Sequence, residues 1–121
     1  MREVNLMSDS CLFCKIIRGE IPSKKLYEDE DIVAFYDIEP QAPVHFLVVP
    51  KKHIANMFEV QIEDAALLGK IAFTAQELAV SEGMGKKGGR FIFNCKSDGS
   101  QSVDHIHMHV LGGRPLAWPP G

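Results

Sequence analysis

The stretch Gln101-Ser102-Val103-Asp104-His105-Ile106-His107-Met108-His109-Val110 decides the expected fold and chemistry of this chain. Three histidines alternate there with apolar residues. In an extended strand successive side chains point to opposite faces, so the alternation predicts a strand with the three imidazoles on one face. A helix would spread the same residues around its axis. Because three of the five histidines in the chain lie within five residues, we expect a functional site rather than an ordinary half-buried strand.

Imidazole suits metal ligation, proton transfer near neutral pH and nucleophilic attack. The residues just before the histidines, Ser97-Asp98-Gly99-Ser100-Gln101-Ser102, are small and rich in hydroxyl groups. Such a loop can turn backbone N–H groups and hydroxyls toward an anion. The Asp-Gly pair is equally a strong signal for an ordinary hairpin turn. Both interpretations hold together, since catalytic groups are often carried on turns.

The composition is that of an ordinary soluble globular protein. The chain has 121 residues, of which 45% are hydrophobic and 24% charged, with a formal net charge of −3. This length predicts a single domain, and the absence of a basic excess argues against a nucleic-acid partner. No apolar run approaches the length of a membrane span, and the first ten residues lack the apolar core of a signal peptide. Three cysteines make no closed disulfide set, so we expect a reducing, cytoplasmic location.

Hydrophobic periodicity predicts an α+β fold. Strands are expected over 25–28, 32–36, 44–49 and 90–94, followed by the histidine strand. A short helix is expected over 11–17 and the longest helix over 62–82, with Gly83 as its C-terminal cap. The segment 83–89 lacks the ending of a phosphate-binding P-loop and does not lead from a strand into a helix, so we interpret it as a flexible connection. The order of elements predicts a mostly antiparallel sheet of about five strands.

Several motifs together resemble the histidine triad (HIT) family, whose signature is His-x-His-x-His flanked by apolar residues. The resemblance extends, in the same order, to Phe35-Tyr36-Asp37-Ile38, to His45-Phe46-Leu47-Val48-Val49-Pro50-Lys51-Lys52-His53, to Asn94 and to Trp118-Pro119-Pro120-Gly121. It is strongest for the Hint branch, the histidine triad nucleotide-binding proteins. That branch consists of homodimeric purine nucleoside phosphoramidases, which hydrolyse adenosine 5′-phosphoramidates and AMP-lysine to AMP and an amine. We therefore expect a HIT domain over 11–113, a flexible tail over 1–10 and a C-terminal tail over 114–121 at the dimer interface.

The resemblance implies that His107 is the nucleophile. A neutral imidazole nitrogen would attack the α-phosphorus, and water would then release AMP from the nucleotidyl-histidine. The other nitrogen of His107 must be protonated and held by an acceptor, for which a backbone carbonyl would serve. His109 and Ser102 are the other expected catalytic residues, with His109 within reach of the phosphate or the leaving group.

The resemblance also implies a nucleotide-binding set. Ser102, the backbone of Ser100 and Gln101, and Asn94 would donate hydrogen bonds to the phosphate or the departing amine, beside His107 and His109. Asp37 would accept hydrogen bonds from the ribose hydroxyls. Phe13, Ile16, Phe35 and Ile38 would form an apolar slot for the purine, although residues of this kind usually belong to a core. The role of His45 stays open.

Cys11-x-x-Cys14 departs from the better-known eukaryotic Hint proteins, which lack these cysteines. In bacterial HIT proteins that carry the pair, zinc is bound by both cysteines, by the histidine of the Pro-Lys-x-His segment and by the first histidine of the triad. The matching residues are Cys11, Cys14, His53 and His105. The resemblance therefore implies a structural zinc ion, with no cofactor needed for the chemistry. Reduced, metal-free thiols are the alternative.

Two other functions stay open at the level of sequence. A dinucleoside polyphosphate hydrolase of the Fhit-like branch would use the same histidines, although the Trp118-Pro119-Pro120-Gly121 ending favours the Hint branch. A nucleotide-binding interaction module with incidental hydrolysis would also fit. Neither nucleic acid nor a membrane is an expected partner.

Overall fold

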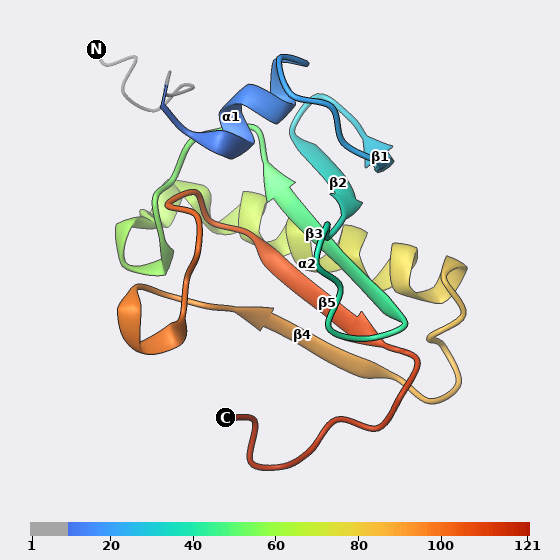
Figure 1. The fold of residues 1–121 in the computed structure, drawn as a ribbon. Helices are drawn as coiled ribbons and strands as arrows, with labels where there is room; N and C mark the ends of the chain where they lie inside the picture. The colour runs from blue at the N-terminus through green and yellow to red at the C-terminus, as the bar shows by residue number, and fades with distance from the viewer. Residues whose placement is uncertain (1–9) are drawn as a thin grey trace.

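The computed structural model describes residues 10–121, so the expected N-terminal tail lies outside the described residues apart from Ser10. Five strands form one antiparallel sheet in the order β1-β2-β3-β5-β4 (Figure 1). The helices and strands are α1 (Leu12–Ile17), β1 (Lys25–Glu28), β2 (Ile32–Tyr36), β3 (Val44–Pro50), α2 (Ala65–Ser81), β4 (Gly89–Phe93) and β5 (Met108–Gly112). Short 3₁₀ helices occupy Met57–Glu59 (η2), Ile62–Asp64 (η3) and Ser97–Gly99 (η4). The α+β prediction and the antiparallel sheet are confirmed.

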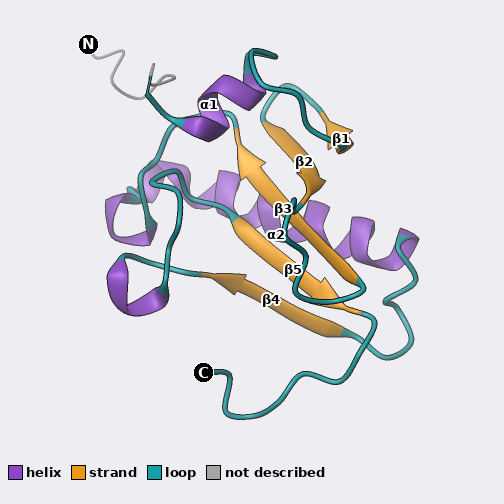
Figure 2. Ribbon diagram, viewed as in Figure 1, coloured by secondary structure: helices purple, strands orange, loops and turns teal. Residues whose placement is uncertain are grey.

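The two faces of the sheet carry different cores, because side chains alternate along each strand. Ile32, Ala34, Phe46, Val48 and Val110 point to the face covered by α2 and pack there with Ile71, Ala75 and Ala79. Val33, Phe35, Leu47 and Val49 point to the other face, where they pack with Phe13, Cys14 and Ile16 of α1. Figure 2 shows α2 running behind the sheet and α1 above the end of β3. The histidines share the face of α1.

A capping box marks the start of the long helix, and a glycine marks its end. Asp64 and Gln61 form a reciprocal capping box before the first turn, which satisfies backbone donors that a helix leaves free. At the other end, Gly83 has a φ of +88°, a conformation that suits glycine because it has no Cβ. The predicted helix over 62–82 and its glycine cap are therefore confirmed, with the first turn in 3₁₀ form.

The predicted histidine strand is only partly correct. β5 begins at Met108, so only His109 of the three histidines lies in the strand. The preceding segment leaves the sheet because its backbone bonds elsewhere: the His105 N–H donates to the Val103 carbonyl, and the Ile106 N–H donates to the Ile54 carbonyl. Extended alternation continues outside the sheet, since His105 and His107 both lie against the ring of Phe13.

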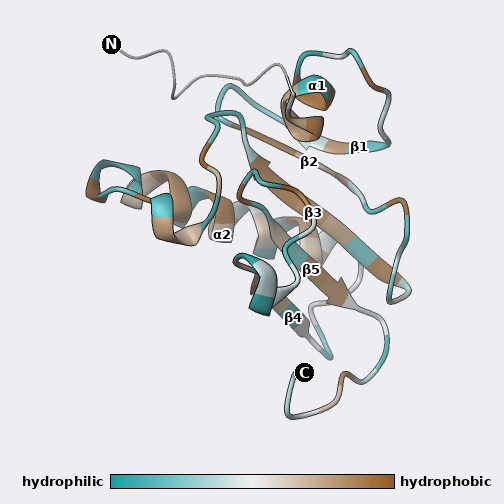
Figure 3. Cartoon of the chain, turned by 60° about the vertical axis from the view of Figure 1, so that its left-hand side comes forward, coloured by the Kyte–Doolittle hydropathy of each residue, from teal (hydrophilic) through white to brown (hydrophobic). Residues whose placement is uncertain are grey.

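Hydrophobic residues concentrate on β2, β3 and β5, the inner strands of the sheet (Figure 3). β4 lies at one edge, and its partner on the inner side is β5. Within residues 10–121, neither the length nor the hydropathy of any helix is sufficient for a membrane span.

Candidate active site and metal cluster

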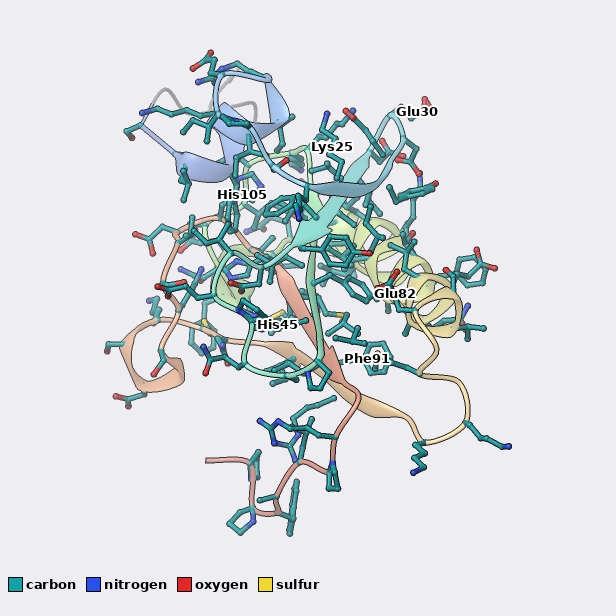
Figure 4. The ribbon with its side chains drawn as sticks, turned by 45° about the vertical axis from the view of Figure 1, so that its right-hand side comes forward. Lys25, Glu30, His45, Glu82, Phe91 and His105 are labelled. Atoms are coloured by element: carbon teal, nitrogen blue, oxygen red, sulfur yellow. The ribbon has the colours of Figure 1, made fainter. Side chains whose placement is uncertain are left out.

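The candidate site lies where β3 and β5 run side by side, on the sheet face that α1 covers. In Figure 4, His105 lies toward α1 and His45 toward the loop between β2 and β3. Three of the histidines are nearly closed to solvent: His45 is 5% exposed, His105 0% and His107 3%. Burial penalises the charged form of imidazole, so these side chains are held neutral unless a ligand supplies negative charge.

Four ligand-type side chains converge below α1. The Nδ1 atom of His105 lies 3.3 Å from Cys11 Sγ, 3.6 Å from Cys14 Sγ and 3.1 Å from His53 Nδ1. His53 Nδ1 lies 3.4 Å from Cys14 Sγ. One ligand atom from each of the four residues lies within 4.8 Å of all the others, so this group can hold a metal ion. The four residues named from the sequence are brought together by the fold.

The surroundings of the cluster prepare these side chains as ligands. His105 Nε2 donates to the carbonyl oxygen of Pro50 at 2.8 Å, which leaves the Nδ1 lone pair directed at the cysteines. Burial lowers the pKa of His105 to about 4, and burial also lowers the pKa of His53. Cys11 is the N-cap of α1, where its sulfur accepts the Cys14 N–H at 3.4 Å. A metal ion binds neutral imidazoles and cysteine thiolates. The unprotonated Nδ1 of His105 therefore suits the cluster to a metal.

His107 is held by the main chain of its neighbour. Its Nδ1 donates to the carbonyl oxygen of His105 at 2.7 Å, the kind of acceptor expected from the sequence. A neutral ring that donates from Nδ1 carries a lone pair on Nε2. Burial lowers the pKa of His107, with the His105 carbonyl opposing the shift. The ring of Phe13 stands perpendicular to that of His107, with the centroids 4.9 Å apart. His107 therefore presents one fixed, unprotonated nitrogen.

His45 and His109 form a hydrogen-bonded pair whose proton positions follow from one backbone group. The Gln41 N–H donates to His45 Nδ1 at 3.0 Å, so neutral His45 carries its proton on Nε2. That nitrogen lies 2.9 Å from His109 Nδ1. His109 Nδ1 must then accept, which leaves the His109 proton on Nε2. Burial, together with the nearby His107 and His45, lowers the pKa of His109 to about 4. The rings of His107 and His109 lie 4.9 Å apart.

Asp37 adds a carboxylate to this pair. Its Oδ2 lies 3.4 Å from His45 Nε2, and its Oδ1 accepts the Glu39 N–H at 2.8 Å. Burial lowers the pKa of His45, while the negative charge of Asp37 opposes that shift. Asp37, His45 and His109 also lie within the distance of a metal-binding group. The hydrogen bonds described above account for the short distances among these three side chains.

The loop before His105 is braced by one side chain. Gln101 accepts the Lys96 N–H through Oε1 at 2.9 Å and donates through Nε2 to the carbonyls of Ala55 and Val103. Lys96 and Ser100 have φ values of 57° and 60°, a strained backbone for residues other than glycine. Ser102 is exposed, and Asn94 is half-buried one residue beyond the end of β4. The side chain of Gln101 thus shapes the loop, and its amide groups are already used.

The four residues expected to form a purine slot do not share one environment. Phe13, Ile16 and Phe35 are buried in the core beneath α1, with 4%, 7% and 4% exposure, whereas Ile38 is 93% exposed. The sequence pattern assigns no role to His45 and does not indicate that Gln41 contacts it. Gln41 acts through a backbone N–H, which every residue but proline carries, so no sequence signal could have revealed it.

Comparison with known proteins decides the family. The family model described as the HIT domain matches residues 18–116. The chain belongs to the HIT family. This HIT protein is 50% identical over 115 residues to an uncharacterised HIT-like protein of Synechococcus elongatus, a match covering 95% of this chain and 100% of that protein.

Solved structures agree with the fold and with the family. A HIT family hydrolase from Legionella pneumophila is 53% identical, with a TM-score of 0.91 and coverage of 93% of this chain and 100% of that one. A histidine triad protein from Clostridium difficile is 42% identical, with a TM-score of 0.89 and coverage of 93% and 97%. These relatives support a hydrolase of the HIT family.

Proposed function

We propose that this HIT protein is a purine nucleoside phosphoramidase, which cleaves the P–N bond of adenosine 5′-phosphoramidates such as AMP-NH₂ and AMP-lysine. The observation that carries the proposal is the fixed state of His107. Its Nδ1–H is held by the His105 carbonyl at 2.7 Å, so its Nε2 lone pair is available to attack phosphorus. A second histidine, His109, lies beside it with a proton on the nitrogen that faces away from His45.

In the first step, His107 Nε2 forms a bond to the α-phosphorus while the P–N bond of the substrate breaks. The negative phosphoryl group favours the protonated form of the neighbouring imidazole, so His109 is an imidazolium in the substrate complex. It gives its Nε2 proton to the departing nitrogen, which leaves as a neutral amine. Neutral His109 then keeps its remaining proton on Nδ1, so the His45 Nε2–H is donated to Asp37 Oδ2, which lies 3.4 Å away. The nucleotide stays on His107.

In the second step, water attacks the phosphorus of the nucleotidyl-histidine and the bond to His107 Nε2 breaks. The proton of the water passes to neutral His109, which restores its protonated form, and AMP is released. The loop with Ser100, Gln101 and Ser102 would supply donors to the phosphoryl oxygens. Since the amide of Gln101 already bonds to Ala55 and Val103, Gln101 would contribute its backbone.

The nucleoside is assigned to the rim of the same face. Asp37 keeps a carboxylate oxygen on the side of His45 and His109, a suitable acceptor for ribose hydroxyls. Ile38, which is 93% exposed, is the apolar side chain free to meet a purine. Asn94 would donate to the phosphate or to the amine from the end of β4.

Zinc is the metal that fits the cysteine–histidine cluster. Tetrahedral zinc, bound at about 2.3 Å to sulfur and 2.0–2.1 Å to nitrogen, separates its ligand atoms by about 3.3 to 3.8 Å. Four of the six separations here are 3.1 to 3.6 Å, and all six lie within 4.8 Å. With four protein ligands the ion would have no open position, so its contribution would be structural: it would tie α1 to the segment before β5.

A second copy of the chain is the proposed partner. β4 is an edge strand on which Phe91 is 43% exposed, and Trp118 of the C-terminal tail is 84% exposed. Open strand edges and exposed aromatic side chains favour association. Sedimentation of the zinc-loaded protein as a monomer at micromolar concentration would contradict this assignment.

The deciding experiment is steady-state hydrolysis of adenosine 5′-phosphoramidate by wild type and by His107→Ala. We expect the variant to lose at least about 10³-fold in kcat, because no other side chain can carry the nucleotide. Acid quench of the wild-type reaction should trap a protein heavier by one AMP group, and the variant should trap none. Gln76→Ala, exposed on α2 and outside the site, serves as the control.

Other outcomes would point elsewhere. Hydrolysis of a dinucleoside tetraphosphate at a rate well above that of the phosphoramidate would indicate a polyphosphate hydrolase. Tight AMP binding without turnover of either substrate would indicate a nucleotide-binding module. Loss of turnover on zinc removal from a protein that stays folded would contradict the mechanism given above.

A further inference from the structure

A basic basin lies at the end of the sheet away from α1. We use this name for the cavity of about 720 Å³ bounded by the connection from α2 to β4 and by the start of the C-terminal tail. Figure 1 shows why these segments meet: α2 ends, β4 begins and β5 ends at the same side of the molecule. Four cationic side chains line the basin, from Lys86, Lys87, Arg90 and Arg114, and no carboxylate does.

The charge of the basin contrasts with the rest of the chain. The protein carries a formal net charge of −3, yet from residue 83 onward it has five Lys and Arg residues and only two acidic residues, Asp98 and Asp104. Every ion pair between described side chains lies within residues 18–70. Within residues 10–121, the four cations of the basin therefore have no acidic partner. Such a cluster repels itself, and a bound anion would relieve that repulsion.

The two arginines are already held in place. Arg90 donates from Nη2 to the Ala117 carbonyl at 2.6 Å. Arg114 donates to the Gln41 carbonyl at 2.9 Å and to the Pro115 carbonyl at 3.0 Å. A guanidinium has five N–H donors, so both side chains keep donors for a ligand. Because their positions are fixed beforehand, binding would cost little side-chain entropy.

The floor of the basin is closely packed. Met84 is buried, and a Cβ atom on Gly112 would lie 2.6 Å from its Cε. A Cβ atom on Gly89 would collide with the Leu111 carbonyl oxygen. Glycine at these positions lets the connection lie directly on β5. From the sequence, residues 83–89 are interpreted as a flexible connection because they lack the P-loop ending. In the structure this segment also forms part of the lining of the basic basin.

We propose that the basic basin binds a small multivalent oxyanion, a molecule that carries two or more phosphate groups. Arginine forks and lysine ammonium groups are the side chains that bind phosphate in proteins. The cavity has the size of a small-molecule pocket and exceeds what a single phosphate would fill. A long nucleic acid is disfavoured, since the remainder of the chain is acidic and would repel it. The proposal is independent of the phosphoramidase reaction.

The test is an NMR titration of the full-length, zinc-loaded ¹⁵N-labelled protein with sodium trimetaphosphate. This cyclic anion carries three phosphates and chelates zinc weakly, and saturating AMP is present to occupy the nucleotide site. We expect saturable shifts in the backbone amides of residues 85–90 and of Arg114. Raising the ionic strength from about 50 to 300 mM should weaken the binding strongly, because salt screens exposed charges.

The variant Lys86→Ala/Lys87→Ala should weaken binding about tenfold or more. Neither lysine forms a side-chain hydrogen bond or ion pair with another described residue, so the change leaves the fold intact, as the remaining spectrum should confirm. The control Lys15→Ala/Lys24→Ala removes the same charge elsewhere and should change the affinity less than about twofold.

Three results would overturn the proposal. They are equal affinity for wild type and Lys86→Ala/Lys87→Ala, shifts confined to the loop and histidines at 100–109, and a titration without saturation. If AMP fails to bind, the proposed function fails while the shifts at residues 85–90 can still be read, so the two proposals are separately testable.

Discussion

At position 45, a buried histidine is held between the backbone N–H of Gln41 and the ring of His109. The amide can only donate, so it determines that His45 donates from Nε2 and that His109 accepts at Nδ1. A side chain that does not contact the reacting atoms thus determines which nitrogen of neutral His109 carries the proton in the free protein. His45 is a positioning residue in this mechanism.

The variant His45→Ala should lower kcat for adenosine 5′-phosphoramidate on the order of 10- to 100-fold, since a general acid and base contributes about 10²–10⁴-fold when correctly placed. Its KM should change little. The readout specific to positioning is the ¹⁵N spectrum of the imidazoles, in which the His109 Nδ1 and Nε2 signals should become a mixture of tautomers. An unchanged His109 spectrum together with a lower kcat would contradict this role.

Residue-scale contacts of this kind could not be predicted from the sequence. The residue type and spacing of His107 and His109 indicate a site, because histidine is rare and the alternation is regular. The Gln41–His45 contact depends on a backbone group in an irregular loop and on the pairing of β3 with β5. Both are products of tertiary structure. The same holds for Gln101: its backbone was expected to donate to the phosphate, and no sequence pattern indicates that its side chain braces the loop.

At the scale of the elements, α2 depends on the buried carboxylate before its first turn. Asp64 is 4% exposed, accepts the Gln61 N–H at 2.9 Å and pairs with Lys52 at 2.6 Å. The hydrogen bond from Lys52, helped by the Gln61 N–H, lowers the pKa of Asp64 from its ordinary value of 3.8. A carboxyl whose pKa is depressed in the folded protein stabilises the fold above its ordinary pKa. That stabilisation is lost as the pH falls through the folded-state pKa.

Asp64→Asn should therefore reduce the free energy of unfolding by about 1–3 kcal/mol at pH 7. The difference from wild type should shrink as the pH falls below the ordinary pKa of 3.8, where the unfolded chain binds a proton, and should vanish below the depressed pKa of native Asp64. Urea denaturation at several pH values measures both. Glu63→Gln, in the same 3₁₀ turn but exposed, is the control and should stay within about 0.5 kcal/mol of wild type. A constant difference at all pH values would exclude the charge of Asp64 as the cause.

The hydrophobic pattern of the sequence predicts which elements form, but it does not predict every element boundary. The apolar spacing of α2 and the continuous apolar runs of β2 and β3 reflect burial on one face or on both, and these elements appear where they were expected. The histidine segment alternates regularly, yet its first half lies outside the sheet because Ile106 bonds to the loop at Ile54. Alternation reports an extended backbone, and pairing with a neighbouring strand is a separate, long-range event.

At the scale of the whole molecule, the cluster of Cys11, Cys14, His53 and His105 joins α1 to two distant parts of the chain. α1 has only six residues, too few for a helix that is stable by itself. Its attachment rests on the core beneath it and on the metal that we assign to the cluster.

Cys14→Ser should remove that metal and lower the melting temperature on the order of 10 °C, because a structural metal site contributes directly to folding. Metal content by mass spectrometry should fall from one zinc per chain to none. Hydrogen exchange should then rise first in α1 while β3 stays protected. Cys95→Ser, outside the cluster, should keep both the metal and the melting temperature. A Cys14→Ser protein with unchanged melting temperature and zinc content would rule out the assignment.

His105 shows how two duties can be divided within one residue. Its imidazole faces the cysteines, while its carbonyl oxygen holds the ring of His107. The second duty belongs to the main chain, which every amino acid carries. A change such as His105→Cys could replace the ligand and leave the acceptor of the nucleophile in place. Substitution at position 105 can thus change the ligands of the metal cluster. The orientation of His107 depends only on the backbone carbonyl at that position, which a substitution leaves in place.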